Sequence, residues 1–157
     1  MPITYLRGDA TCPVASGAKI IAHVANDAAK WGRGFVMAVS AKWPGPREFY
    51  LRAHRLGLEN SKLGGVQLVE VRRGLCVASM VAQRGTKTGS SGPPIRYDAL
   101  ATCLEKVAAE ARRLGASVHM PRIGCGLAGG RWDRVEPILA QALGGVPVFV
   151  YDLGSGR

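Results

Sequence analysis

Residues 119–132 read HMPRIGCGLAGGRW and separate the apolar segment Ser117–Met120 from a helical pattern that begins at Trp132. Four of the seven residues from Gly124 to Gly130 are glycines. Because glycine loses more conformational freedom on folding than other residues, such a run indicates a backbone that must turn sharply or be approached closely. Glycine-rich loops between a strand and a helix commonly bind phosphate through backbone N–H groups. The stretch therefore predicts a strand, a phosphate-binding loop and a helix.

A second loop of the same kind precedes it in the chain. The segment Trp31–Gly34 (WGRG) follows the apolar pattern Lys19–Val24 and precedes a helical pattern over Phe35–Lys42. Two such loops at the carboxyl ends of neighbouring strands would hold a diphosphate from two sides.

A nicotinamide-binding reading of the later loop is disfavoured. Gly124, Gly126 and Gly129 fit the pattern GxGxxG, and Asp152 follows Gly129 by 23 residues (152 − 129). The dinucleotide fingerprint opens a βαβ unit and places an acidic residue about 20 residues further on. Here only one strand pattern follows the loop, so the position in the chain is wrong for that fold.

The other periodic segments alternate between strand and helix patterns, which predicts a three-layer α/β/α domain. The turn Arg72-Arg73-Gly74 predicts a hairpin, so the sheet is expected to be mixed but mostly parallel. We expect one domain over residues 1–157, with a Gly/Ser-rich loop at 84–94 and a frayed tail at 154–157. Strands are predicted at Ile3–Arg7, Lys19–Val24, Val66–Val71, Leu75–Val81, Ser117–Met120 and Val146–Leu153, and helices at Phe35–Lys42, Glu48–Leu56, Arg96–Leu114 and Trp132–Leu143.

Composition narrows the class of protein. The 157 residues are 47% hydrophobic, which suits one domain with a substantial core. No apolar run approaches the roughly 20 residues of a membrane span, and the N-terminus shows no secretory pattern, so we expect a cytoplasmic monomer without membrane contact. The four cysteines are scattered, which favours free thiols over a metal site. The net charge of +10 favours anionic partners, including nucleic acid.

Polar side chains that follow the first two predicted strands are candidate ligand contacts. Asp9 suits either a bond to an adenine amino group or the capping of a turn. Asn26 and Asp27 suit either a ligand or an Asx turn that leads into the first glycine loop. His23 lies inside an apolar strand and is expected to be a hydrogen-bonded core residue.

Six segments together resemble a macrodomain, in the branch that contains the terminal ADP-ribose protein glycohydrolase and its bacterial and phage relatives. The similarity runs from Ile3 to Leu153. The segments are GDAT (8–11), AHVAND (22–27), WGRGF (31–35), PPIRYDAL (93–100), MPRIGCGL (120–127) and VYDL (150–153).

The resemblance implies a mixed sheet of about six strands and a pocket for ADP-ribose as ligand, with no cofactor and no metal. Asn26 should lie near the distal ribose. The implied binding residues are Asp9 and Ala10 at the adenine; Gly32, Arg33, Gly34 and Phe35 in the first phosphate loop; Arg122, Ile123, Gly124, Cys125, Gly126 and Leu127 in the second; and Tyr151 and Leu153 on the adenine side.

Two departures from the glycohydrolase bear on catalysis. Gln83 stands where that enzyme has a lysine, and Ala128 stands where it has an aspartate, which excludes the same covalent lysyl intermediate. Arg84 stays protonated and cannot replace the lysine. A positioned water that attacks C1 of the distal ribose is the remaining route, with Asn26 or Gln83 orienting it. Asp27 or a substrate phosphate is the candidate base.

These features predict a bacterial hydrolase that removes mono-ADP-ribose from protein carboxylates or nucleic-acid bases, with a role in the DNA damage response. Its partners would be ADP-ribose and ADP-ribosylated protein or nucleic acid. Two alternatives stay open: a non-catalytic reader of ADP-ribose, and a phosphatase of ADP-ribose 1″-phosphate.

Overall fold

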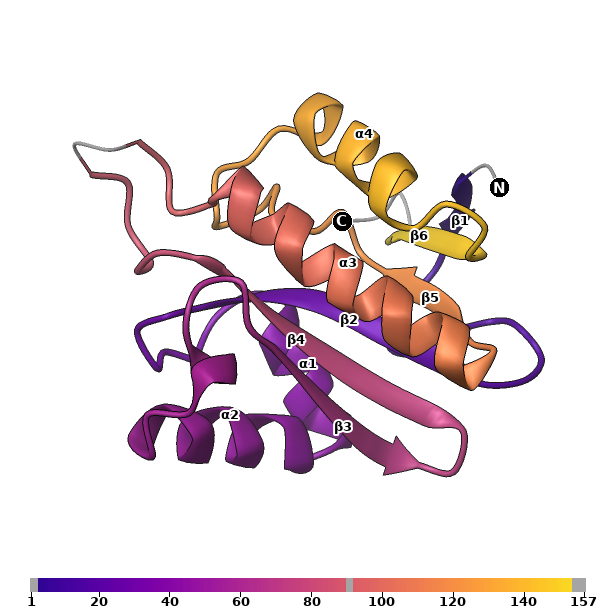
Figure 1. Cartoon of the computed structure of the whole chain (residues 1–157), viewed down its shortest axis with the longest axis horizontal. Helices are drawn as coiled ribbons and strands as arrows, with labels where there is room; N and C mark the ends of the chain where they lie inside the picture. The colour runs from indigo at the N-terminus through magenta and orange to yellow at the C-terminus, as the bar shows by residue number, and fades with distance from the viewer. Residues whose placement is uncertain (1–2, 90–91, 154–157) are drawn as a thin grey trace.

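A six-stranded sheet forms the centre of the computed structural model, which describes residues 3–89 and 92–153 (Figure 1). The predicted frayed tail at 154–157 lies outside the described residues. The strands are β1 (Ile3–Arg7), β2 (Lys19–Asn26), β3 (Val66–Arg72), β4 (Leu75–Gln83), β5 (Ser117–Met120) and β6 (Val148–Asp152), and the helices are α1 (Phe35–Lys42), α2 (Gly45–Arg55), α3 (Tyr97–Leu114), α4 (Trp132–Ala142) and the short 3₁₀ helix η1 (Glu59–Ser61).

The order of the strands across the sheet is β1-β6-β5-β2-β4-β3. Only the β3–β4 hairpin is antiparallel among the described strand pairs; every other neighbouring pair is parallel. The prediction of a mixed, mostly parallel sheet is therefore confirmed. Since β2, β4, β5 and β6 run in one direction, the loops that follow them leave the same edge.

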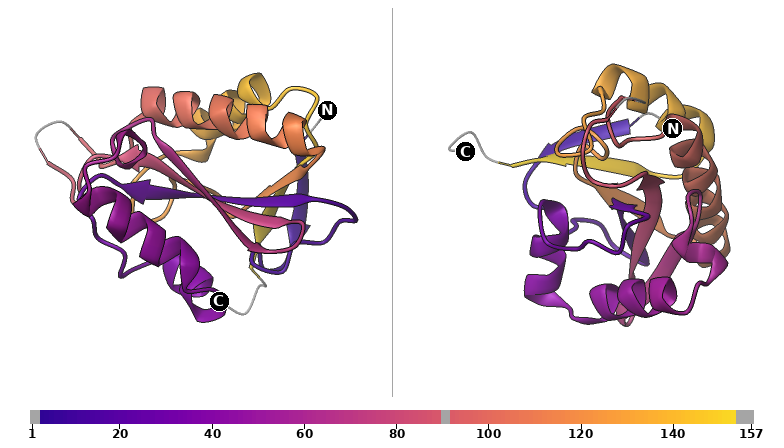
Figure 2. Two further views of the ribbon diagram at one scale, coloured as in Figure 1. Left: turned by 60° about the horizontal axis from the view of Figure 1, so that its bottom comes forward. Right: turned by 90° about the vertical axis from the view of Figure 1, so that its left-hand side faces the viewer.

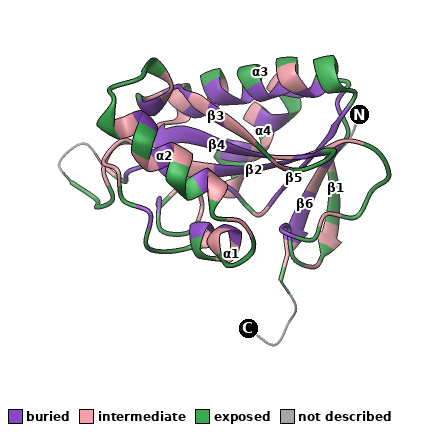
Figure 3. Cartoon of the chain, turned by 90° about the horizontal axis from the view of Figure 1, so that it is seen from below, coloured by how far each residue is buried: buried purple, intermediate pink, exposed green. Residues whose placement is uncertain are grey.

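Helices cover both faces of the sheet, with α3 and α4 on one side and α1 and α2 on the other (Figure 2, left). Strand β2 contributes to both cores because successive side chains point to opposite faces. Ile20 belongs to the core under α3 and α4, whereas Ile21 packs with Trp31 and Val39 on the α1 side. Figure 3 shows the central strands largely buried and β1 largely exposed. A strand buried on both faces explains the continuous apolar run in the sequence.

Several boundaries differ from the predicted ones. Strand β2 continues to Asn26, past a bulge between Ala25 and Asn26, because pairing with β4 carries it beyond its last apolar residue. Helix α2 begins at Gly45, because Pro46 lies in the first turn, where no N–H is needed. In the described part of the chain, no helix is long and apolar enough to cross a membrane.

Two histidines lie inside the sheet. His119 Nε2 pairs with the Ser117 hydroxyl at 2.8 Å, and Nδ1 pairs with the Tyr151 hydroxyl at 2.7 Å. His23 Nε2 pairs with the Ser79 hydroxyl at 2.8 Å, which confirms it as a core histidine. Burial lowers the pKa of each imidazole to about 4. Both rings are therefore neutral at physiological pH.

We predict that the protein loses stability between pH 6.5 and pH 4. In this range the unfolded chain protonates both imidazoles and the folded chain does not, so the unfolded state binds more protons. The stability that the two neutral imidazoles contribute is fully present above pH 6.5 and is lost as the pH falls toward 4. Thermal unfolding across this range should show a falling melting temperature, and His119→Gln should make that fall shallower. A His119→Gln profile parallel to that of the wild type would contradict the assignment.

Candidate functional site

A cleft lies at the edge where β2, β4 and β5 end. Figure 1 shows the loops after β2 and β4 leaving this edge side by side. The cleft consists of two adjoining hollows of about 310 and 290 Å³. Five residues are shared by the linings of the two hollows: Val24, Arg33, Val36, Gln83 and Leu127. Since small-molecule sites commonly measure about 300–1,000 Å³, the cleft is large enough for a nucleotide-sized ligand.

The first glycine loop is held by an aromatic cluster beneath it. Trp31 is buried, packs against His23 and Tyr50 at centroid distances of 5.4 and 5.1 Å, and donates its indole N–H to Ser40 Oγ at 2.8 Å. Helix α1 begins directly after Gly34, which has a φ of 83°. No described residue accepts a hydrogen bond from the N–H groups of Gly34, Phe35 or Val36. These donors, at the positive end of a helix, are suited to an anion.

The second glycine loop closes on itself. Gly130 N–H donates to the Gly124 carbonyl at 2.7 Å, and Gly129 N–H donates to the Gly126 carbonyl at 3.1 Å. A Cβ on Gly130 would overlap the Gly124 carbonyl oxygen, and one on Gly129 would press on Pro93 at 2.8 Å. These glycines are required by the loop itself. Gly126 is different, because it is exposed and a Cβ there would meet nothing within 4 Å.

The two loops face one another across the cleft. Leu127 Cδ1 lies 3.4 Å from the position that a Cβ on Gly34 would take. Within residues 3–89 and 92–153, no acceptor binds the N–H groups of Gly124, Gly126 or Leu127. Unpaired backbone donors therefore stand on both sides of one cavity. Such an arrangement can bind the two phosphates of a diphosphate.

Gln83 and Asn26, two of the three predicted catalytic residues, line the cleft together. Gln83 ends β4 and borders both hollows. The side-chain oxygen of Asn26 (Oδ1) accepts from Ala28 N–H at 2.9 Å and lies 2.8 Å from the Tyr50 hydroxyl, which can donate to it. The amide group donates to the Lys30 carbonyl at 2.7 Å. Asn26 thus forms the predicted Asx turn and keeps one amide hydrogen for a ligand.

Asp27, the third predicted catalytic residue, is directed away from the cleft. It lines a neighbouring hollow with His54 and Arg84. Its carboxylate accepts from Gly85 N–H at 2.8 Å and lies 3.7 Å from the Arg84 guanidinium. These contacts tie the loop after β2 to the loop after β4.

The residues predicted near adenine gather at the ends of β1 and β6, outside the lining of the two hollows. Burial raises the pKa of Asp9, but two hydrogen bonds from Thr11 and the nearby Lys42 outweigh burial and lower it overall. Asp9 therefore caps a turn as a carboxylate. Ala10 is buried, Tyr151 is buried and bonded to His119, and Leu153 is 54% exposed.

The side chain of Arg122, which is predicted to bind the ligand, makes several contacts within the protein. Its guanidinium bonds the Asp152 carboxylate at 2.7 and 2.9 Å. It also lies 5.2 Å from the ring centroids of both Tyr5 and Trp132. This network fixes the start of the second glycine loop to β6 and α4, while Ile123 beside it is buried and Cys125 is half-buried.

Sequence reasoning missed several residues that line the cleft. Lys30, Thr86 and Lys87 border the hollow that contains Asn26 and Gln83. The topology of the sheet could have indicated them, because the two loops that carry these residues follow strands that end at this edge. His23 and Ala128 border the other hollow. Among the described residues, no group of three or more His, Cys, Asp or Glu side chains is placed to hold a metal ion.

The fold and the cleft define an α/β domain with a cleft between two glycine loops. No model of a protein family matches the chain. A macrodomain protein from Streptomyces coelicolor is 49% identical over 98% of this chain and 100% of that chain, with a TM-score of 0.86. A protein of unknown function from Bacteroides thetaiotaomicron is also 49% identical, over 98% and 99% of the two chains, with a TM-score of 0.94. The chain belongs to the macrodomain family.

Curated relatives include an enzyme. Human ADP-ribose glycohydrolase OARD1 is 27% identical over 96% of this chain and 91% of its own length. The mouse chromodomain-helicase-DNA-binding protein 1-like is 32% identical over 95% of this chain. This chain spans only 17% of that mouse protein, so the likeness concerns one of its segments. The macrodomain resemblance inferred from the sequence motifs is confirmed.

We predict that Gly130→Ala destabilises the protein by about 1–3 kcal/mol, because the added methyl group overlaps a backbone carbonyl that cannot move away. Gly126→Ala is the matched control, because its methyl group enters open space. Urea unfolding should give a lower midpoint for the first variant and a change of less than about 1 kcal/mol for the second. Equal midpoints would show that the loop does not need its close backbone contact.

Proposed function

We propose that this macrodomain is an ADP-ribosyl hydrolase that removes mono-ADP-ribose from a modified macromolecule. The observation that carries the proposal is the pair of loops with unpaired backbone N–H groups on both sides of one cleft. A diphosphate held there would place the distal ribose beside the ends of β2 and β4. The likeness to ADP-ribose glycohydrolase OARD1 supports the same ligand.

In the proposed mechanism, water attacks C1 of the distal ribose. The Gln83 side chain and the remaining Asn26 amide hydrogen orient the water, because both groups line the cleft where β2 and β4 end. The bond from C1 to the acceptor, C1–O for a carboxylate or C1–N for a base, breaks as the new C1–O bond to water forms, and the acceptor leaves with the bonding electrons. A phosphate oxygen of the substrate takes the proton from water, since Asp27 is bonded outside the cleft. Catalysis would come mainly from positioning.

A non-catalytic reader of ADP-ribose is the second candidate. The observation that favours it is the absence of Asp and Glu from the described residues that line the two hollows. General acid–base catalysis typically contributes about 10²–10⁴-fold. In enzymes that hydrolyse glycosidic bonds, Asp and Glu are the usual acid and base, and the lining of this cleft contains neither. The ionisable lining residues Lys30, Arg33 and Lys87 are basic and suit binding of a diphosphate.

Release of ADP-ribose separates the hydrolase from the reader, and a parallel incubation with ADP-ribose 1″-phosphate tests the phosphatase. Protein and oligonucleotide acceptors that carry labelled mono-ADP-ribose are incubated with the chain, and released ADP-ribose is measured. Release from either acceptor supports the hydrolase. Binding of ADP-ribose without release supports the reader, and release of phosphate from ADP-ribose 1″-phosphate alone supports a phosphatase.

We predict that Gly126→Glu weakens ADP-ribose binding at least about tenfold, or about 1.4 kcal/mol. A Cβ at Gly126, which lines the cleft, would meet nothing within 4 Å, and the added carboxylate repels the diphosphate. Gly144→Glu makes the same charge change after α4, outside the cleft lining, and should bind like the wild type. Titration calorimetry measures both. Unchanged affinity in a folded Gly126→Glu protein would place the ligand elsewhere.

We predict that Gln83→Ala lowers the hydrolysis rate about 100-fold and changes the affinity for ADP-ribose by less than about threefold, because Gln83 is proposed to position water. Single-turnover rates and calorimetry separate the two effects. Borohydride treatment during turnover should leave no ADP-ribose on the chain, since the mechanism has no lysyl intermediate. A trapped adduct on Lys30 or Lys87, which both line the cleft, would replace the water mechanism with a covalent one.

A further inference from the structure

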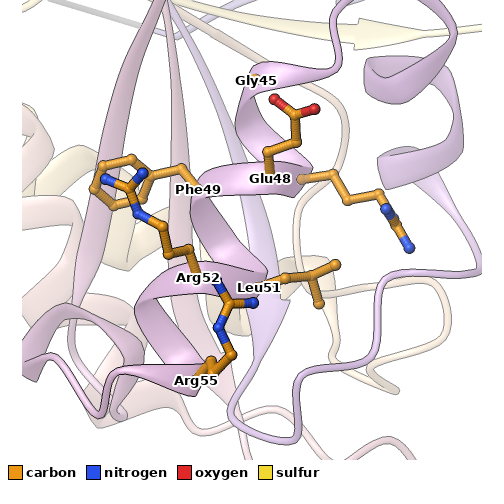
Figure 4. A pocket seen from close by; sticks show the side chains of 7 residues that line it. Gly45, Glu48, Phe49, Leu51, Arg52 and Arg55 are labelled. Carbon is orange, nitrogen blue, oxygen red and sulfur yellow. The ribbon is translucent and has the colours of Figure 1, made fainter.

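The solvent-exposed surface of α2, which we call its outer surface, carries a further hollow of about 540 Å³ (Figure 4). It shares no lining residue with the proposed hydrolase cleft. Pro46, Tyr50 and Ala53 form the buried side of α2, and the half-buried Leu51 packs against the same core. The charged residues of the hollow are exposed. The hollow is lined by Gly45, Arg47, Glu48, Phe49, Leu51, Arg52 and Arg55.

The positive charge of this surface is not neutralised by the protein. Arg47, Arg52 and Arg55 are exposed, and none makes an ion pair or a side-chain hydrogen bond to another described residue. Arg113 and Arg122, elsewhere on the surface, each pair with a carboxylate. The only carboxylate in the lining of the α2 hollow comes from Glu48. Three arginines against one glutamate leave a net charge of +2 (3 − 1).

Helix geometry places Arg52 and Arg55 side by side and Arg47 about 140° around the helix from Arg52. Arg52 and Arg55 are three residues apart and therefore adjacent on the helix. The 11 residues of α2 span roughly 16 Å. A single strand carries one phosphate per nucleotide, so this length suits contact with more than one phosphate. Phe49 and Leu51 lie half-buried beside the guanidinium groups and add apolar contact area.

The hollow between α2 and the cleft carries both signs of charge. Lys62 and Arg84 line it together with Asp27. Lys62 pairs with Glu59, and Arg84 lies 3.7 Å from Asp27. Lys30, Arg33 and Lys87 follow in the cleft itself. The unpaired arginines of α2 are therefore separated from the basic residues of the cleft by a region of mixed charge.

We propose that the outer surface of α2 binds the phosphate backbone of nucleic acid, a function beyond the proposed hydrolysis. Guanidinium groups bind phosphate in a bidentate manner, and an adjacent phenyl ring suits stacking of a base. An acidic peptide is the competing partner, but it offers neither a planar base for Phe49 nor a regular array of phosphates. The net charge of +10 adds attraction over longer distances.

The test measures binding of an unmodified, fluorescently labelled single-stranded DNA of about 20 nucleotides, which exceeds a site of about 4–16 nucleotides. Fluorescence anisotropy is recorded at several salt concentrations for the wild type and for the triple variant Arg47→Gln/Arg52→Gln/Arg55→Gln. The slope of log K against log salt should become shallower by about 2, since each lost phosphate contact on a single strand contributes about 0.7. Affinity at low salt should fall at least about tenfold.

The matched control is Arg112→Gln/Arg113→Gln/Arg134→Gln, which removes three arginines from α3 and α4 on the other side of the sheet. Its affinity and salt slope should stay close to those of the wild type. Single variants Arg52→Gln and Arg55→Gln should each change the slope by about 0.7, so the test survives if the triple variant misfolds.

Three results would overturn the proposal. They are the absence of DNA binding by the wild type at low salt, equal loss in the control and α2 variants, and stronger competition by a poly-glutamate peptide than by unlabelled DNA. Because the DNA carries no ADP-ribose, none of these results bears on hydrolysis. Calorimetry with ADP-ribose should give the α2 variants wild-type affinity, which shows that they are folded and tests the cleft separately.

Discussion

The backbone of Gly130 lies against the carbonyl of Gly124, in a contact that leaves no room for a side chain at Gly130. This contact closes the second glycine loop and fixes the turn between β5 and α4. The closed loop presents Gly126 and Leu127 toward Gly34 at the start of α1. The cleft, its unpaired N–H groups and the proposed ligand all follow from this closure, because a more open loop would not face the helix end.

The sequence predicts the order of the elements well because the pattern changes sharply between strands and helices. The continuous apolar run that follows Lys19 identifies a strand buried on both faces, and the turn at Arg72–Gly74 identifies the antiparallel β3–β4 hairpin. Strand ends are harder to predict. Asn26 and Gln83 remain in their strands because neighbouring strands pair with them, which single-strand patterns do not reveal.

The site is predictable in its backbone and less so in its side chains. Both glycine loops are visible in the sequence, and their position at the ends of parallel strands brings them together. The glycines have two different roles: Gly130 allows the close backbone contact that closes the loop, whereas Gly126 leaves space in the cleft. The direction of Asp27 depends on Gly85 in another loop, and Lys87 reaches the cleft from that same loop. Such tertiary contacts have no signature in local sequence.

A crystal structure of the protein with ADP-ribose tests the central claim most directly. The account predicts the diphosphate between the two glycine loops, with its oxygens accepting from N–H groups of Gly34 or Phe35 on one side and of Gly126 or Leu127 on the other. The distal ribose should then lie beside Gln83. Diphosphate density outside this cleft, or bound by side chains alone, would contradict the account.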